Sequence, residues 1–398
     1  MLYINRIKFS IVTLYIILMS TQFIIIEGFV YSPVKVIAML FSPIIIFVLG
    51  YHRQISKELF YAFLCIAVMT LCAMLSSSIV SWQRIGYRAM FFMMFVCVSY
   101  IIQDDCIELN QFVNLFKIII ISYGITILIQ HICYLIGFRE IPFFNFYGSV
   151  TMAGVFKPNG LSCEPSHSAR ILTILYWGYL KLLEIQRGYS IKLSEVFRID
   201  LFTTLLFIFS MLTMGSATAL IGIFLIVFYL TYKKLGFWLL IPIILLLLMN
   251  VEIDNSLVKR VQAIFNSLFS DDVAHTMIKN EGSGAVRIMP LINTLTNLDL
   301  FAGDSWIGQG SMHDMNVDFI DRVFSKTRYV GDVTDFGLFT YIIMLIFVYK
   351  CCIRRFFSMQ SLLFLCLATF SVGSVYYTWL MLIVFYIVKH YSETYEIN

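Results

Sequence analysis

A succession of apolar runs of membrane-spanning length most constrains how this chain can fold. Inside a bilayer every backbone N–H and C=O must be paired within the protein, so a span is a helix of about 20 apolar residues. The chain is 60% hydrophobic and only 13% charged, about half the charged share of an ordinary soluble domain. We count about twelve candidate spans, near 10–29, 34–50, 59–78, 87–103, 113–137, 167–184, 200–214, 217–232, 236–250, 332–349, 358–373 and 375–388. The sequence therefore predicts an all-α polytopic integral membrane protein, with residues 1–398 forming a single membrane domain.

The positions of the basic residues predict the orientation of these spans. Loops that face the cytoplasm collect Lys and Arg. With a cytoplasmic N-terminus, the inside loops receive Arg53, Lys57, Lys181, Arg187, Lys192, Arg198, Lys233, Lys234, Lys350, Arg354, Arg355 and Lys389. Both termini are then expected in the cytoplasm. The net charge of +4 calls for no nucleic-acid partner, because topology accounts for the positive residues.

This orientation places two long polar segments on the outer side, at 138–166 and 251–331. The second segment begins with an amphipathic pattern, SLVKRVQAIFNSLF, that suits a helix lying against lipid or against other protein. The cysteines show neither a disulfide framework nor metal-ligand spacing. Cys163 is expected to pack as a small apolar residue and not to act as a nucleophile.

The first outer segment contains the polar stretch GVFKPNGLSCEPSHSAR. Pro158-Asn159-Gly160 is a turn signal, and Glu164-Pro165-Ser166 marks a helix start. His167 and Arg170 are three residues apart and share a helix face. An Arg near the hydrocarbon needs an anion. Two readings stay open at this point: Arg170 binds a ligand phosphate, or Glu164 and Arg170 form an ion pair that fixes the loop.

Three further polar features stand outside this stretch. Arg287 follows the glycines of EGSGAVR, and His313 follows those of IGQGSMHD; taken alone, each is expected to be a solvated loop residue. The turn MGSATA joins two closely paired spans, and its small residues allow close helix approach.

In these residues the chain resembles the O-antigen polymerases of the Wzy type and, more distantly, the O-antigen ligases. In that family a basic residue, a glycine and an acidic-Pro-Ser element precede a span, as Lys157, Gly160 and Glu164-Pro165-Ser166 do here. The turn GSATAL, the Arg287 segment with its following IGQG, and GDVTDFGLFTYI at 331–342 match later parts of the family in the same order. Lys157 stands where an Arg is common in the family.

The resemblance implies a GT-C-like membrane glycosyltransferase of the bacterial inner membrane, with its site facing the periplasm. Its substrates would be glycans on undecaprenyl diphosphate, and a chain-length regulator would be a partner in the bilayer. Glu164 would be the base, with His313 or His167 second, and Arg287 would act on the leaving diphosphate. The substrate-binding residues would be Lys157, Gly160, Ser166, His167 and Arg170. We expect an inverting reaction with no metal and no cofactor, since Arg charges can carry the diphosphate.

Two other functions remain as alternatives. An O-antigen ligase shares the topology and the donor but transfers the glycan to lipid A-core. A transporter of lipid-linked glycans would carry charges inside its spans and inverted repeats between its halves, and the sequence shows neither. We therefore place the polymerase first, the ligase second and the transporter third.

Overall fold

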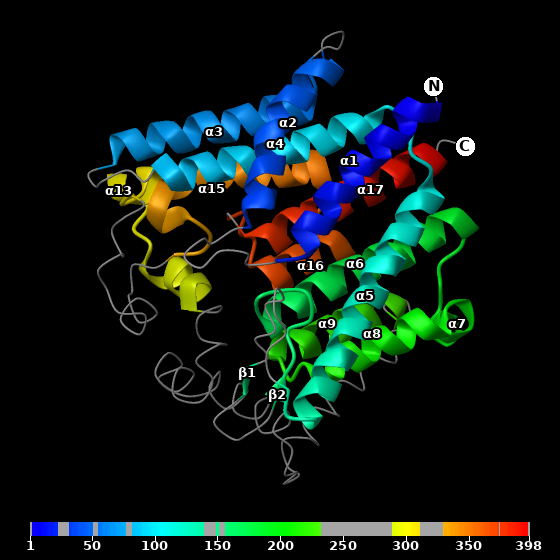
Figure 1. Ribbon diagram of the computed structural model, residues 1–398. Helices are drawn as coiled ribbons and strands as arrows, with labels where there is room; N and C mark the ends of the chain where they lie inside the picture. Colours follow the sequence, from blue (N-terminus) through cyan, green and yellow to red (C-terminus); the bar gives the residue numbers. More distant parts are fainter. Residues whose placement is uncertain are drawn as a thin grey trace.

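The computed structural model describes residues 2–22, 32–50, 55–76, 82–138, 149–150, 156–231, 289–310, 329–373 and 375–396. Apart from one short hairpin, the regular structure of this part of the chain is a bundle of helices (Figure 1). The predicted span at 236–250 and the predicted amphipathic helix lie outside the described residues.

The elements follow the apolar runs of the sequence. The helices are α1 (Leu2–Ser20), α2 (Pro33–Gly50), α3 (Lys57–Leu75), α4 (Trp82–Gln103), α5 (Leu109–Leu135), α6 (Pro165–Arg187), α7 (Leu193–Ile199), α8 (Leu201–Thr213), α9 (Ala217–Thr231), α13 (Gly303–Ile307), α15 (Val333–Phe347), the π-helical turn η1 (Val348–Cys352), α16 (Met359–Ala368) and α17 (Tyr376–Glu396). The strands β1 (Ser149–Val150) and β2 (Phe156–Lys157) pair antiparallel, with Ser149 opposite Lys157. Residues 289–297 are also helical.

Several of these helices have the length and composition of membrane spans. Four qualify within the described residues: α3, α4, α5 and α15 together with η1. A fifth span results if α7 and α8, which meet at 114°, are counted as one broken span. The chain is therefore a membrane-embedded, all-α protein, and the larger number of twelve spans stays a prediction.

The bend between α7 and α8 lies at the start of the predicted span at 200–214, and α8 (Leu201–Thr213) falls within that span. Asp200 causes the bend, because its backbone is not helical and its side chain accepts a hydrogen bond from the Thr203 amide at 3.2 Å. The same carboxylate accepts from the Tyr179 hydroxyl at 2.9 Å and pairs with Lys117 at 2.8 Å. A capped helix therefore starts here, at a carboxylate shared by three elements.

α6 lies at the centre of the bundle and packs on α5, α9 and α17. The α6–α17 contact is close: a Cβ added at Gly178 would lie 2.6 Å from Val384 Cγ1. At the neighbouring positions, the rings of Trp177 and Phe385 meet edge to face with centroids 5.4 Å apart. Because α6 and α17 are fixed together over their length, the residues at the start of one helix are held against the start of the other.

The two ends of the chain lie at the same end of the bundle (Figure 1). Two polar contacts fasten this end to the α4–α5 connection. Lys8 of α1 pairs with Asp104 at 2.6 Å, and His390 of α17 lies 2.9 Å from Asp105. The acidic residues of this connection thus supply partners for groups on both terminal helices.

Candidate functional site

The turn predicted at Pro158-Asn159-Gly160 is present, and α5 holds it in place. The Gly160 amide donates to Gln130 Oε1 at 2.9 Å, and Gln130 Nε2 donates to Asn159 Oδ1 at 2.8 Å. Asn159 in turn donates from Nδ2 to the Ser162 carbonyl at 2.7 Å. Asn159 is fully buried, so its amide is a structural element of the turn.

Gly160 also fixes the distance between this turn and the helices behind it. Its φ of 59° lies in the left-handed region, and an added Cβ would stand 2.8 Å from Tyr123 Cδ1. The Tyr123 hydroxyl donates to the Ser20 carbonyl, and the Gln22 amide donates to the Leu161 carbonyl at 3.0 Å. Gly160 is therefore a packing residue of a turn pressed against α5 and tied to the end of α1.

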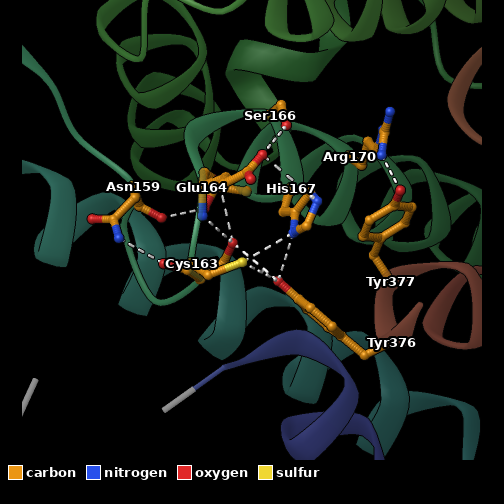
Figure 2. A network of polar contacts seen from close by, with 10 residues as sticks. Asn159, Cys163, Glu164, Ser166, His167, Arg170, Tyr376 and Tyr377 are labelled. Carbon is orange, nitrogen blue, oxygen red and sulfur yellow. Dashed lines mark hydrogen bonds and ion pairs between the residues drawn. The ribbon is translucent and has the colours of Figure 1, made fainter. Parts of the chain in front are cut away.

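The turn leads into α6, whose start matches the prediction. Glu164 is the N-cap residue with extended backbone angles, and Pro165 is the first helical residue. The Glu164 side chain makes no capping hydrogen bond and is 63% exposed. It accepts from the Ser166 hydroxyl at 3.2 Å, and its Oε2 lies 3.8 Å from His167 Nε2. An accessible carboxylate therefore stands at the mouth of the helix, beside a hydroxyl and an imidazole (Figure 2).

His167 connects α6 to the start of α17. Its Nδ1 lies 3.2 Å from Cys163 Sγ and 3.2 Å from the Tyr376 hydroxyl, which also reaches Ser162 Oγ at 3.2 Å. Figure 2 shows these side chains converging on one point. Burial raises the pKa of the Cys163 thiol, so the sulfur stays protonated and is a weak nucleophile. This supports the packing role expected for Cys163.

Arg170 lies one turn further into α6. Its guanidinium carbon stands 4.5 Å from the centre of the Tyr377 ring, and Nη1 donates to the hydroxyl of Tyr377. The Tyr377 ring also contacts His167 at a centroid distance of 4.8 Å. The shared face of His167 and Arg170 is thereby confirmed.

The predicted alternative of a Glu164–Arg170 ion pair is wrong. Within the described residues, Arg170 pairs with no carboxylate, and its buried Nε has no hydrogen-bond partner. Glu164 turns instead toward Ser166 and His167, while Arg170 turns toward Tyr377 (Figure 2). The two charges thus stay separate on the same helix start.

Lys157 contacts a different element, the turn between α8 and α9. A Cβ added at Gly215 would lie 3.5 Å from both Cγ and Cε of Lys157. Gly215 itself has a φ of 56°, as the predicted tight turn requires. The neighbouring Phe156 stacks on Tyr134 of α5 at 4.4 Å, which fixes the strand that carries Lys157. The structure therefore brings together Lys157 and the Gly-Ser-Ala turn, two motifs that are 58 residues apart by numbering.

Arg287 and His313 lie outside the described residues. The glycine-rich turn between them is described at Gly308 and Gly310. The Gln309 amide donates to the Thr334 carbonyl at 2.8 Å, and the Gly310 amide donates to the Asp335 carbonyl at 3.2 Å. This turn is thus docked onto the start of α15.

The sequence reasoning missed several polar residues that the structure places near the helix mouth. Lys35 is buried in α2; its Nζ donates to the Thr21 carbonyl at 2.9 Å and stands 4.3 Å from the centre of the Tyr376 ring. Tyr376 and Tyr377 themselves begin α17, more than 200 residues after their partners His167 and Arg170. The only sequence signal for their role was the pair of adjacent tyrosines at the start of the apolar run at 375–388.

A second cationic cluster, which we also did not predict, lies at the start of α15. Arg88 of α4 pairs with Asp332 at 2.6 Å, and its guanidinium carbon lies 4.5 Å from the centre of the Phe336 ring. Arg84 pairs with Asp335 at 3.1 Å. The spacing Arg-x₃-Arg on one helix and Asp-x₂-Asp at the entry of another was the signal for complementary faces.

The described residues contain no group of three or more His, Cys, Asp or Glu side chains arranged to hold a metal ion. What the helix mouth offers is an exposed carboxylate, a neighbouring imidazole and cations that are held on aromatic rings. Such an arrangement can accept a proton from a hydroxyl and stabilise an anion nearby. No family model, curated protein or solved structure matches the chain.

Proposed function

We propose that this protein is a membrane glycosyltransferase that polymerises a polysaccharide, of the O-antigen polymerase kind and with a GT-C-like fold. It transfers a growing glycan from undecaprenyl diphosphate onto a lipid-linked repeat unit. One observation carries the proposal: an exposed carboxylate, Glu164, and a cation without a described carboxylate partner, Arg170, start the same central helix of a membrane-embedded chain. Charges of both signs are costly at such a position unless they are used.

The proposed reaction is a direct displacement. Glu164 takes the proton from the acceptor hydroxyl, and that oxygen attacks the anomeric carbon of the donor sugar. The bond between that carbon and the diphosphate oxygen breaks, and undecaprenyl diphosphate leaves with the bonding electrons. Attack opposite the leaving group inverts the anomeric carbon. The raised pKa of Cys163 favours this single step over a covalent intermediate on sulfur.

The cations have the complementary task. Arg170 is held by Tyr377 and keeps donors for an oxyanion, since a guanidinium presents five N–H groups. Ser166 and His167 lie against the Glu164 carboxylate and orient it. Lys157 lies on the adjacent hairpin and supplies a point charge. Arg287 and His313 remain expected contributors, as a diphosphate ligand and as a second base.

The site would face the periplasm of a bacterial inner membrane, because the positive-inside pattern puts the start of α6 outside. The donor and acceptor then reach it from the outer leaflet. A chain-length regulator in the same membrane is the expected protein partner.

The test is the surface glycan of cells that lack this protein, complemented at matched membrane levels. Wild type should restore a ladder of chain lengths, whereas Glu164→Gln and Arg170→Gln should leave core plus a single repeat. Glu393→Gln and Arg198→Gln, which change exposed residues outside the candidate site, should restore the full ladder. Full ladders from Glu164→Gln and Arg170→Gln would refute the site.

The deletion strain itself separates the alternatives. Loss of all O-antigen from the core, with polymer retained on the lipid carrier, identifies a ligase. Lipid-linked repeats that accumulate on the cytoplasmic side identify a transporter. Core molecules that carry one repeat identify the polymerase.

A further inference from the structure

A cavity of about 950 Å³ lies at the opposite end of the bundle from the helix mouth. α6 and α17 both start at the candidate site, and both contribute to the cavity near their other ends, through Lys181 and Lys389. Lys181 lies 16 residues after Pro165, the first residue of α6, which corresponds to roughly 24 Å along the helix. The cavity is therefore distinct from the site proposed above.

The charges around this cavity are strongly unequal. Among the described residues, its lining contains four cations and one carboxylate, namely Lys181, Arg354, Arg355, Lys389 and Glu184. Glu184 is 8% exposed and already saturated: Lys181 Nζ donates to it at 2.9 Å, the Ile191 amide at 3.0 Å, and the Tyr229 hydroxyl as well. The carboxylate therefore does not neutralise the remaining cations.

The remaining cations are arranged on two elements. Lys389 of α17 donates to the carbonyls of Lys350 at 2.8 Å and Cys351 at 3.2 Å, which fixes its ammonium group at the cavity. Arg354 and Arg355 follow η1 and are exposed. Arg355 makes no ion pair with any described residue. Two adjacent guanidinium groups with a fixed ammonium beside them form a receptor for an oxyanion with several oxygens.

The apolar side of the cavity selects what carries that oxyanion. Phe356 and Phe357 directly follow the two arginines and are 61% and 94% exposed. Exposing two adjacent aromatic rings to water is unfavourable, so such a patch marks a site of contact with lipid or protein. Exposed aromatic rings beside basic residues are typical of the interface between membrane and water. Behind them, Trp177 and Leu365 add apolar wall. A phosphate attached to acyl chains satisfies both the charges and the rings, whereas free phosphate satisfies only the charges.

We propose that this cavity binds the headgroup of an anionic phospholipid from the leaflet at this end of the bundle. The phosphate lies between Arg354, Arg355 and Lys389, and the acyl chains leave past Phe356 and Phe357. Charge complementarity carries the assignment, and the cavity volume of about 950 Å³ lies within the range of small-molecule sites, about 300–1,000 Å³. The expected cytoplasmic placement agrees with it, because anionic lipids attract basic segments there.

The test uses the full chain purified in mild detergent, with bound lipid counted by native mass spectrometry. Phosphatidylglycerol and phosphatidylcholine with identical acyl chains are the probes, and glycerol phosphate is the competitor without chains. Wild type should retain phosphatidylglycerol at least about tenfold better than phosphatidylcholine, since each basic group near an anionic surface contributes severalfold. Glycerol phosphate in excess should not displace it.

Two variants and a control make the test specific. Arg354→Gln with Arg355→Gln should reduce phosphatidylglycerol retention to the level of phosphatidylcholine. Phe357→Ser should weaken the retention of both lipids, since this ring contacts chains and not phosphate. Arg198→Gln removes an exposed charge from α7, away from the cavity lining, and should change neither.

Three results would overturn the proposal. Equal retention of the two lipids by wild type would show that the cations select nothing. Equal behaviour of the Arg354/Arg355 variant and the Arg198 variant would place the lipid elsewhere. Complete displacement by glycerol phosphate would show a site for the free phosphate group only.

Discussion

Arg170 and Arg88 have the same aromatic neighbour geometry and different electrostatic surroundings. Each guanidinium carbon stands 4.5 Å from the centre of an aromatic ring, Tyr377 for Arg170 and Phe336 for Arg88. Arg88 is 4% exposed and has a carboxylate, Asp332, at 2.6 Å. Arg170 has a phenol in place of the carboxylate.

The difference separates a charge that is paired within the fold from the charge that we propose to be available for a ligand. A phenol orients a guanidinium without neutralising it, because it carries no charge of its own. A carboxylate at 2.6 Å neutralises it and leaves little attraction for a further anion. Because both arginines contact an aromatic ring, the ring contact does not distinguish their roles. The presence of a carboxylate partner at Arg88, and its absence among the described neighbours of Arg170, does.

The largest expected effect is on the Arg88 side. Asp332→Ala leaves the buried Arg88 charge without its carboxylate and should lower the free energy of unfolding by about 3–5 kcal/mol. The measurement is denaturant or thermal unfolding of the purified protein in detergent. Asp335→Ala is the matched control: its partner Arg84 is 42% exposed, so the loss should stay below about 1 kcal/mol. Equal losses would remove the distinction between a buried and an exposed pair.

Substitution of Arg170 should affect the reaction strongly and the stability of the fold only slightly. Arg170→Gln should lower the rate of glycan polymerisation roughly a hundredfold, the typical effect of removing one donor to a developing oxyanion. Its unfolding free energy should change by less than about 1 kcal/mol, since no ion pair is broken. Chain-length analysis and unfolding are measured on the same preparation. A large loss of stability with normal polymerisation would show that Arg170, like Arg88, stabilises the fold and takes no part in the reaction.

The rigidity of the turn beside Arg170 gives a smaller effect. Gly160→Ala adds a Cβ 2.8 Å from Tyr123 Cδ1 at a φ of 59° and should cost about 1–3 kcal/mol beyond the backbone strain. Gly137→Ala is the control, with a φ of 78° and nothing within 4 Å of an added Cβ, and should show the strain alone. If both substitutions cost the same, the turn is less firmly packed on α5 than its contacts indicate.

The smallest effect concerns Cys163, next to His167. Burial raises its pKa, so alkylation near neutral pH should be slower than that of the same cysteine in denatured protein. The rate should rise only as the pH passes above the ordinary thiol value. The unfolded thiol releases its proton first, so the contribution of this group to stability falls as the pH rises through that range. Peptide mapping of Cys163 after timed alkylation measures this, and faster labelling than in the denatured chain would point to an activated thiol.

Local chemistry made the start of α6 predictable. Pro158-Asn159-Gly160 and Glu164-Pro165 encode a turn and a helix start within eight residues, and both are where the sequence places them. The apolar runs likewise predicted α3, α4, α5 and α15 as membrane-length helices. Such features depend on neighbours in the chain, which a sequence displays directly.

Partners from distant elements were not predictable in the same way. Nothing near Arg170 in the sequence indicates that Tyr377 will be its partner, because that contact depends on how α6 and α17 pack. The Glu164–Arg170 pair looked plausible because both charges lie close to the start of α6, yet the Glu164 carboxylate accepts a hydrogen bond from Ser166 instead. The break of α15 at Gly337, with a φ of 74°, depends on a close approach of Trp306 that only the fold reveals.

The Asn159–Gly160 turn also has a consequence for how the protein ages. An Asn followed by Gly is chemically fragile, because the glycine nitrogen can attack the side-chain amide and convert it to a carboxylate through a cyclic imide. Here the Gly160 nitrogen donates to Gln130, and the Asn159 amide is buried and held at both its oxygen and its nitrogen. The folded turn therefore holds both reacting groups in hydrogen bonds, and we expect the conversion to proceed when the turn opens. The mass gained at Asn159 over days of storage becomes a record of how long the mouth of α6 has spent unfolded.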